Sequence, residues 1–287
     1  MNWFILTILA ALFWGFENFL YKVSAQKGYN STKITTIFGV TVTVLSLLLF
    51  FIFKEKISNI SFLLLIAFLN AVTFFSSVIT RFEALKRIRI NVFYPINRTG
   101  TLFLMIIISY LFLNQRLTSL QIVGLIVTIL AIYLLTTNKE RDTKQYIKIG
   151  LILTFASTLF AALGNFTLEF VKGTFSFTFF SYGLGFILSY LLGKLQKNNE
   201  SQSNVIINKG FLNIYSLGIF IGILNFTGLV FFIEALKTGP FSIVGAVLNF
   251  SLLITLSLGL IIYKERPTKN QIFGTILSFL ALVLFKI

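Results

Sequence analysis

The chain has 287 residues, enough for two soluble domains, but with 56% hydrophobic residues, 11% charged residues and a mean hydropathy of +0.90 it has too little polar surface to face water. Its net charge of +15 does not indicate nucleic acid binding, because Lys and Arg lie between apolar segments rather than along one face. Neither Cys nor His occurs, which excludes disulfides, thiolate or imidazole metal sites and Ser-His-Asp triads.

Continuous apolar runs predict an all-α integral membrane protein, since a helix that crosses the hydrocarbon needs about 20 mostly apolar residues. The first run lacks a basic leader and carries Trp14, Glu17 and Asn18, so it is not read as a cleaved signal peptide. Ten spans are expected, in chain order 3–21, 34–53, 61–80, 91–113, 119–137, 147–168, 174–193, 211–233, 241–263 and 270–286.

The two halves of the chain resemble each other. Each half is expected to contain five spans, an odd number, so the second half enters the membrane from the opposite side. The sequence therefore predicts an inverted-topology repeat, a feature of carriers that open alternately to the two sides. The landmarks that recur in the same order are EALK at 83–86 and 234–237, NQRLTSLQIVG at 114–124 against KERPTKNQIFG at 264–274, and ENF at 17–19 against GNF at 164–166.

The opening FWGFENFLYK keeps a W-G-x6-K pattern at Trp14, Gly15 and Lys22. With the paired EALK elements, this pattern resembles the EamA branch of the drug/metabolite transporter superfamily over essentially the whole chain. The resemblance implies ten transmembrane helices as two inverted five-helix repeats, 1–137 and 147–287, joined by a polar linker at 138–146. It also implies a central cavity between the repeats, and substrates that are amino acids, other metabolites, nucleotide sugars or organic cations.

This sequence departs from the pattern in its second half. Ala161 and Ala162 stand where the first half has Trp14 and Gly15, and Glu169 stands in place of Lys22. Relative to the small multidrug exporters of the same superfamily, Trp14 occupies the position of their proton-binding Glu. Their drug/proton exchange mechanism is therefore not carried over to this chain.

Glu17 lies inside the first span, and a charged side chain there is costly unless it serves a function or lies in a protein cavity. Trp14 and Tyr21 lie on the same helix face, three residues before it and four after it. Glu17 is expected to bind a substrate amine or a proton. The alternative is a structural ion pair with Arg98.

Arg98 lies in the fourth span, in the stretch YPINRTG. Its forked guanidinium suits a carboxylate or phosphate. Pro95 removes a backbone hydrogen bond and is expected to loosen this helix, which favours its neighbours as cavity residues. The complete set expected to bind substrate is Trp14, Glu17, Asn18, Tyr21, Tyr94, Asn97, Arg98, Asn165 and Asn249, the last of which aligns with Arg98 in the repeat.

These residues favour a secondary carrier for a small polar metabolite, amino acids first, with Arg98 on the carboxylate and Glu17 on the ammonium group. An organic-cation transporter is the alternative, and an intramembrane enzyme acting on lipid-linked substrates a weaker one. We expect no catalytic residue, cofactor or metal, and no nucleic acid partner. The expected setting is the plasma membrane, with the lipid bilayer and the small substrate as partners and the monomer as the functional unit.

The side on which the termini lie is left open. Lys and Arg concentrate in the odd-numbered loops, which the positive-inside rule would place in the cytoplasm, with both termini outside. The family resemblance implies the reverse, with both termini in the cytoplasm.

Overall fold

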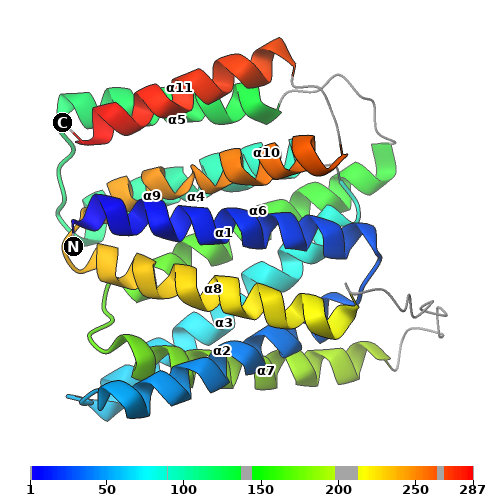
Figure 1. Cartoon of the computed structure of the whole chain (residues 1–287), viewed down its shortest axis with the longest axis vertical. Coiled ribbons are helices and arrows are strands. Elements are labelled where there is room, and N and C mark those ends of the chain that lie inside the picture. The colour runs from blue at the N-terminus through cyan, green and yellow to red at the C-terminus, as the bar shows by residue number, and fades with distance from the viewer. Residues whose placement is uncertain (1, 89, 137–143, 198–212, 264–267, 287) are drawn as a thin grey trace.

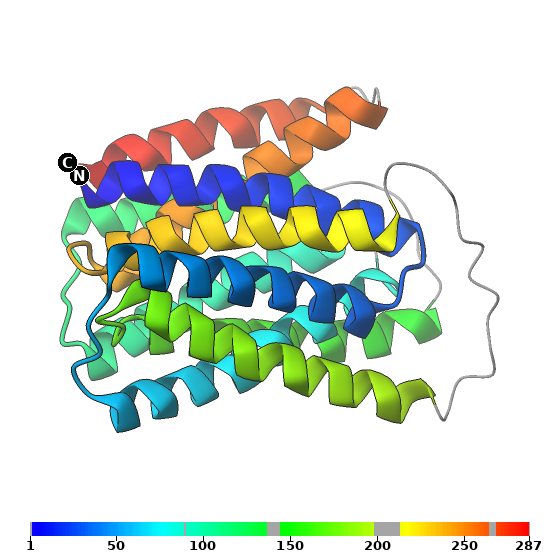
Figure 2. The same ribbon diagram turned by 60° about the horizontal axis from the view of Figure 1, so that its bottom comes forward.

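The described residues of the computed structural model, 2–88, 90–136, 144–197, 213–263 and 268–286, form helices joined by short turns and loops (Figures 1 and 2). Seven helices are long and apolar enough to cross a membrane, and three shorter apolar stretches lie at 96–112, 119–134 and 272–285. This confirms an all-helical membrane fold, while the ten spans stay a prediction. The helices are α1 (Trp3–Gln26), α2 (Ser31–Phe53), α3 (Ile60–Leu85), α4 (Ile90–Phe112), α5 (Ser119–Thr136), α6 (Lys144–Leu168), α7 (Thr174–Lys197), α8 (Ile214–Leu236), α9 (Phe241–Leu248), α10 (Ser251–Tyr263) and α11 (Lys269–Lys286).

Asparagine begins several of these helices. Its side-chain oxygen accepts a hydrogen bond from a backbone N–H of the first turn, which would otherwise have no partner inside the helix. The four asparagines that do so are Asn2, Asn30, Asn59 and Asn213, at the starts of α1, α2, α3 and α8. Helix α7 is capped differently: Glu55, which follows α2, accepts from the backbone N–H groups of Phe175 (3.0 Å) and Ser176 (2.8 Å).

The packing of the helices repeats between the halves. Helix α1 packs on α8 as α6 packs on α3, and α2 packs on α8 as α7 packs on α3. Two further pairs, α2 with α7 and α5 with α11, each join equivalent helices of the two halves. They lie at opposite edges of the bundle (Figure 1). Helices α1 and α6 run in opposite directions, and so do α3 and α8 (Figure 1). The two EALK segments consequently lie at opposite ends of the bundle, as the predicted inverted repeat requires.

Several expected spans differ from the structure. The first, third and seventh were expected to end at residues 21, 80 and 193, but α1 continues to Gln26, α3 to Leu85 and α7 to Lys197. The ninth, 241–263, is divided into α9 and α10 at Asn249 and Phe250, where turn hydrogen bonds run from the N–H of Leu252 to the carbonyl of Asn249 and from Leu253 to Phe250. Helix α4, by contrast, continues as one helix through Pro95.

The predicted linker at 138–146 is only partly visible. Residues 138–143 lie outside the described residues, and 144–146 already belong to α6. The outer surface of the bundle is apolar: Phe51, Phe112 and Ile261 are each about two thirds or more exposed, at 67%, 68% and 72%. Such side chains suit contact with lipid rather than water.

Candidate functional site

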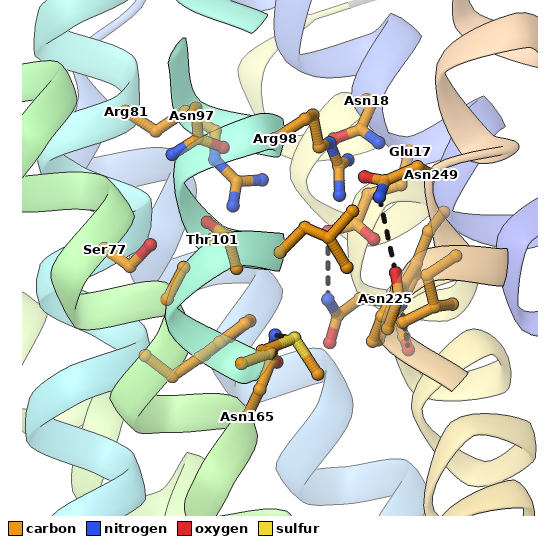
Figure 3. Close-up of a pocket in the computed structure, with 17 residues that line it drawn as sticks. Glu17, Asn18, Ser77, Arg81, Asn97, Arg98, Thr101, Asn165, Asn225 and Asn249 are labelled. Atoms are coloured by element: carbon orange, nitrogen blue, oxygen red, sulfur yellow. Dashed lines mark hydrogen bonds between the residues drawn. The ribbon is translucent and has the colours of Figure 1, made fainter. Parts of the chain in front are cut away.

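A narrow cavity of about 70 Å³ lies in the middle of the bundle (Figure 3). Helices of both halves line it: α1, α3 and α4 from the first, and α6, α8 and α9 from the second. The lining residues are Trp14, Glu17, Asn18, Phe74, Ser77, Arg81, Asn97, Arg98, Thr101, Leu102, Met105, Ala161, Asn165, Asn225, Gly245, Leu248 and Asn249.

Of the residues expected to bind substrate, the two tyrosines do not line this cavity. Tyr21 and Tyr94 are buried, at 0% and 1% exposed, and their hydroxyl groups donate to residues that do line it. Tyr21 donates to Glu17 and Tyr94 to the backbone carbonyl of Asn18, at 2.6 Å and 3.5 Å. The others line it: Trp14, Glu17, Asn18, Asn97, Arg98, Asn165 and Asn249.

Residues at matching positions of the repeat meet in this one cavity. Asn18 and Asn165, which belong to the ENF and GNF segments, both line it, and so do Arg98 and Asn249. An inverted repeat explains this convergence, since its pseudo-symmetry axis brings the same depth of both halves to the middle of the membrane.

Glu17 is held by one residue from each half. Its Oε1 accepts a hydrogen bond from the Tyr21 hydroxyl at 2.6 Å and another from the Asn225 side-chain amide at 2.9 Å (Figure 3). The Asn225 oxygen in turn accepts from the Tyr182 hydroxyl at 2.6 Å. Glu17 is 4% exposed. Two fixed donors orient it toward the cavity without neutralising its charge.

Arg98 shares the cavity with a second arginine, Arg81 of α3. The Nε atom of each is buried and has no hydrogen-bond partner, and the same holds for Oγ1 of Thr101. The Arg81 guanidinium lies over the Tyr21 ring, 5.8 Å from its centroid, a cation–π arrangement. In Figure 3 the guanidinium groups of Arg81 and Arg98 both point into the cavity.

Two cavity residues, Arg81 and Asn225, are not among those expected from the sequence. Arg81 fell one residue beyond the expected end of the third span. Asn225 carries no distinguishing neighbour in the sequence, and only its bond to Glu17 across the halves identifies it. One weak signal exists in the sequence. Thr80 and Arg81 follow Ser77 by three and four residues, so all three share a polar helix face that continues past residue 80.

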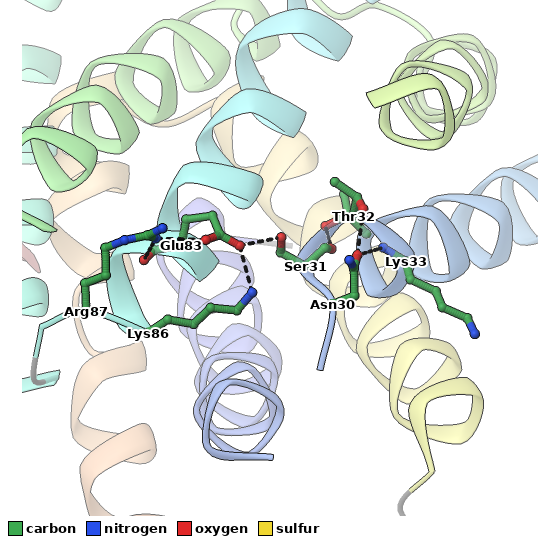
Figure 4. A network of polar contacts seen from close by, with 8 residues as sticks. Asn30, Ser31, Thr32, Lys33, Glu83, Lys86 and Arg87 are labelled. Atoms are coloured by element: carbon green, nitrogen blue, oxygen red, sulfur yellow. Dashed lines mark hydrogen bonds and ion pairs between the residues drawn. The ribbon is translucent and has the colours of Figure 1, made fainter. Parts of the chain in front are cut away.

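The two EALK segments build matching clusters at the two ends of the bundle. At one end Glu83 accepts from Ser31 of α2 at 2.9 Å and from Lys86 at 2.8 Å (Figure 4). At the other, Glu234 accepts from Thr174 of α7 at 2.7 Å and from Lys237 at 2.6 Å. Each cluster joins the end of one helix to the start of another in the same half.

Comparison with known proteins agrees with this architecture. A crystal structure of a protein superposes with a TM-score of 0.78 at 14% identity, covering 99% of this chain and 98% of that one, which shows a shared fold. No curated protein matches the chain. The model of the EamA-like transporter family matches residues 1–137 and 148–287. The chain therefore belongs to the EamA-like transporter family, whose members are membrane transporters.

Proposed function

We propose that this transporter is a secondary carrier for amino acids or closely related small metabolites, working by alternating access through the central cavity. The expected setting is the plasma membrane, with the monomer as the functional unit. The observation that carries the proposal is the presence of two opposite charges in one cavity between the repeats: the Glu17 carboxylate and the Arg98 guanidinium. A zwitterion needs both groups.

The charge of the cavity favours this substrate over an organic cation. Two guanidinium groups, those of Arg81 and Arg98, would repel a cation, and only Glu17 among the described lining residues would attract it. The lining by both halves favours a carrier over an enzyme that admits lipid-linked substrates from the side.

Uptake of radiolabelled amino acids into proteoliposomes tests the proposal. Arg98→Ala should abolish uptake and binding while the protein stays folded, since the carboxylate loses its forked partner. Arg98→Lys should rescue only part of it, because Lys keeps the charge but not the fork. Arg116→Ala, which removes an exposed arginine outside the cavity, is the matched control and should transport normally. Unchanged amino acid affinity in Arg98→Ala would remove Arg98 from the site and contradict the proposal.

A further inference from the structure

The cavity contains two arginines, Arg81 and Arg98, and the proposed amino acid site needs only one of them. A zwitterion has one carboxylate, yet two guanidinium groups reach the cavity, from the neighbouring helices α3 and α4 (Figure 3). Within the part of the chain that the structure describes, neither forms a hydrogen bond or an ion pair, and both Nε atoms are buried without a partner. Both residues are half-buried overall, and a guanidinium whose Nε is buried is normally paired with an anion, so the two side by side suit the binding of an anionic group.

Glu17 does not supply that anion. It lies within 4.0 Å of neither arginine as an ion pair among the described residues, and its Oε1 is taken by Tyr21 and Asn225. Even with Glu17 ionised, the charged lining residues Glu17, Arg81 and Arg98 leave the cavity with one positive charge more than it has negative charges. A bound substrate with one net negative charge would balance it.

We propose that the substrate is an amino acid with a second carboxylate on its side chain, of the aspartate or glutamate class. Its two carboxylates would each take one guanidinium, and its ammonium group would take Glu17. The charges of the site and of the ligand then cancel. The unpartnered Thr101 hydroxyl, on the same helix as Arg98, offers one more donor to the same anion. This inference rests on the proposed amino acid function and narrows it.

Tyr21 fixes the spacing that this recognition needs. Its hydroxyl donates to Glu17 and its ring lies under the Arg81 guanidinium, so a single fully buried side chain holds the ammonium-binding and one carboxylate-binding group in a set relation. A rigid spacing between groups of opposite charge selects for the separation of charges in the ligand.

The deciding experiment compares isosteric ligands on the purified protein. Aspartate and asparagine have nearly the same shape, as have glutamate and glutamine, and only the side-chain charge differs. The acidic member of a pair should bind at least about tenfold more tightly, since its neutral isostere leaves a buried guanidinium without an anion. Tight binding of asparagine or glutamine with no preference for the acids would overturn the inference and leave the amino acid proposal standing. Binding of no amino acid at all would overturn both.

Variants of the two arginines show which of them binds the side-chain carboxylate of the ligand. Arg81→Gln and Arg98→Gln should each weaken aspartate binding by about tenfold or more, and the variant that removes the guanidinium facing the side chain should lose the preference for aspartate over asparagine. Arg81→Lys, which keeps the charge, should retain part of that preference, and an unchanged melting temperature of Arg81→Gln shows that its loss of preference is not a failure to fold. A preference for aspartate that persists unchanged in both Gln variants would contradict the inference.

Discussion

Glu17 and Asn225, 208 residues apart in the chain, are joined by a hydrogen bond of 2.9 Å between Oε1 and Nδ2. The bond connects α1 of the first half to α8 of the second inside the central cavity. The carboxylate also accepts from Tyr21, so its position depends on both halves at once. Any movement of one half against the other would therefore change the distance between this carboxylate and one of its two donors.

Removing either donor should weaken this arrangement. Asn225→Leu and Tyr21→Phe each leave the buried Glu17 carboxylate with one donor, at a cost of about 1–3 kcal/mol in the free energy of unfolding. Thermal unfolding in detergent measures the loss. Tyr110→Phe, on a tyrosine that is 68% exposed, is the control and should change nothing. Equal stability of Tyr21→Phe and Tyr110→Phe would show that the bond to Glu17 contributes nothing.

Glu17→Gln separates recognition from structure. The amide oxygen of Gln can accept from both Tyr21 and Asn225, so the variant keeps the hydrogen bonds and loses the charge. Affinity for amino acids should fall by about tenfold or more at every pH, because the ammonium group loses its counter-charge, while thermal stability changes by less than about 1 kcal/mol. If Glu17 only balanced the arginines, the result would be reversed: lower stability with normal transport per folded molecule.

Helix α7 packs closely on the aromatic side chains of α2 and α3, and this close packing leaves no room for a larger residue at Gly185. A Cβ on Gly185 would collide with the ring of Phe75, which is 2% exposed and stacks on Phe38 at 5.5 Å. Gly185→Ala should therefore cost about 1–3 kcal/mol through overpacking. Gly183→Ala on the same helix is the matched control, since its nearest neighbour, Thr43, would lie at 3.8 Å. Equal melting temperatures for the two variants would rule out the tight contact.

Glu169, just beyond the end of α6, gives the protein a pH dependence. Burial raises the pKa of its carboxyl group from the ordinary 4.5 to about 7, and its Oε2 has no hydrogen-bond partner. Between these values the folded protein binds a proton that the unfolded chain has released, so stability should fall as the pH rises from about 4.5 to about 7. Glu169→Gln should lack this fall and exceed the wild type most at pH above 7. Parallel unfolding curves against pH for the two proteins would refute it.

The helical membrane fold and the paired halves could be predicted from the sequence because they depend on long-range patterns, hydropathy and internal similarity. Helix ends could not. Helix α3 passes its expected end and includes Arg81, whose guanidinium lies over the ring of Tyr21, a contact between distant segments that the sequence does not reveal. The break between α9 and α10 carries no Pro or Gly at Asn249 and Phe250, so local sequence gave no signal.

The candidate site, too, could be predicted only in part from the sequence. Glu17 and Arg98 could be predicted because charge is rare inside apolar spans. A charged side chain is costly in contact with lipid, so both were expected to face a cavity. Tyr21 and Tyr94 shared a helix with these residues, but the sequence does not reveal that their hydroxyl groups turn inward to Glu17 and Asn18. Which polar residue meets which is decided by packing between helices.

The most direct test of alternating access measures the two ends of the cavity at once. The native chain has no Cys, so spin labels attach only where Cys is introduced. Lys86 with Tyr215 spans the end where α3 finishes and α8 begins, and Ser61 with Lys237 spans the opposite end (Figure 1). Adding aspartate should lengthen one distance and shorten the other, in double-Cys variants that still transport. Distances that change in the same direction, or not at all while transport continues, would contradict the account.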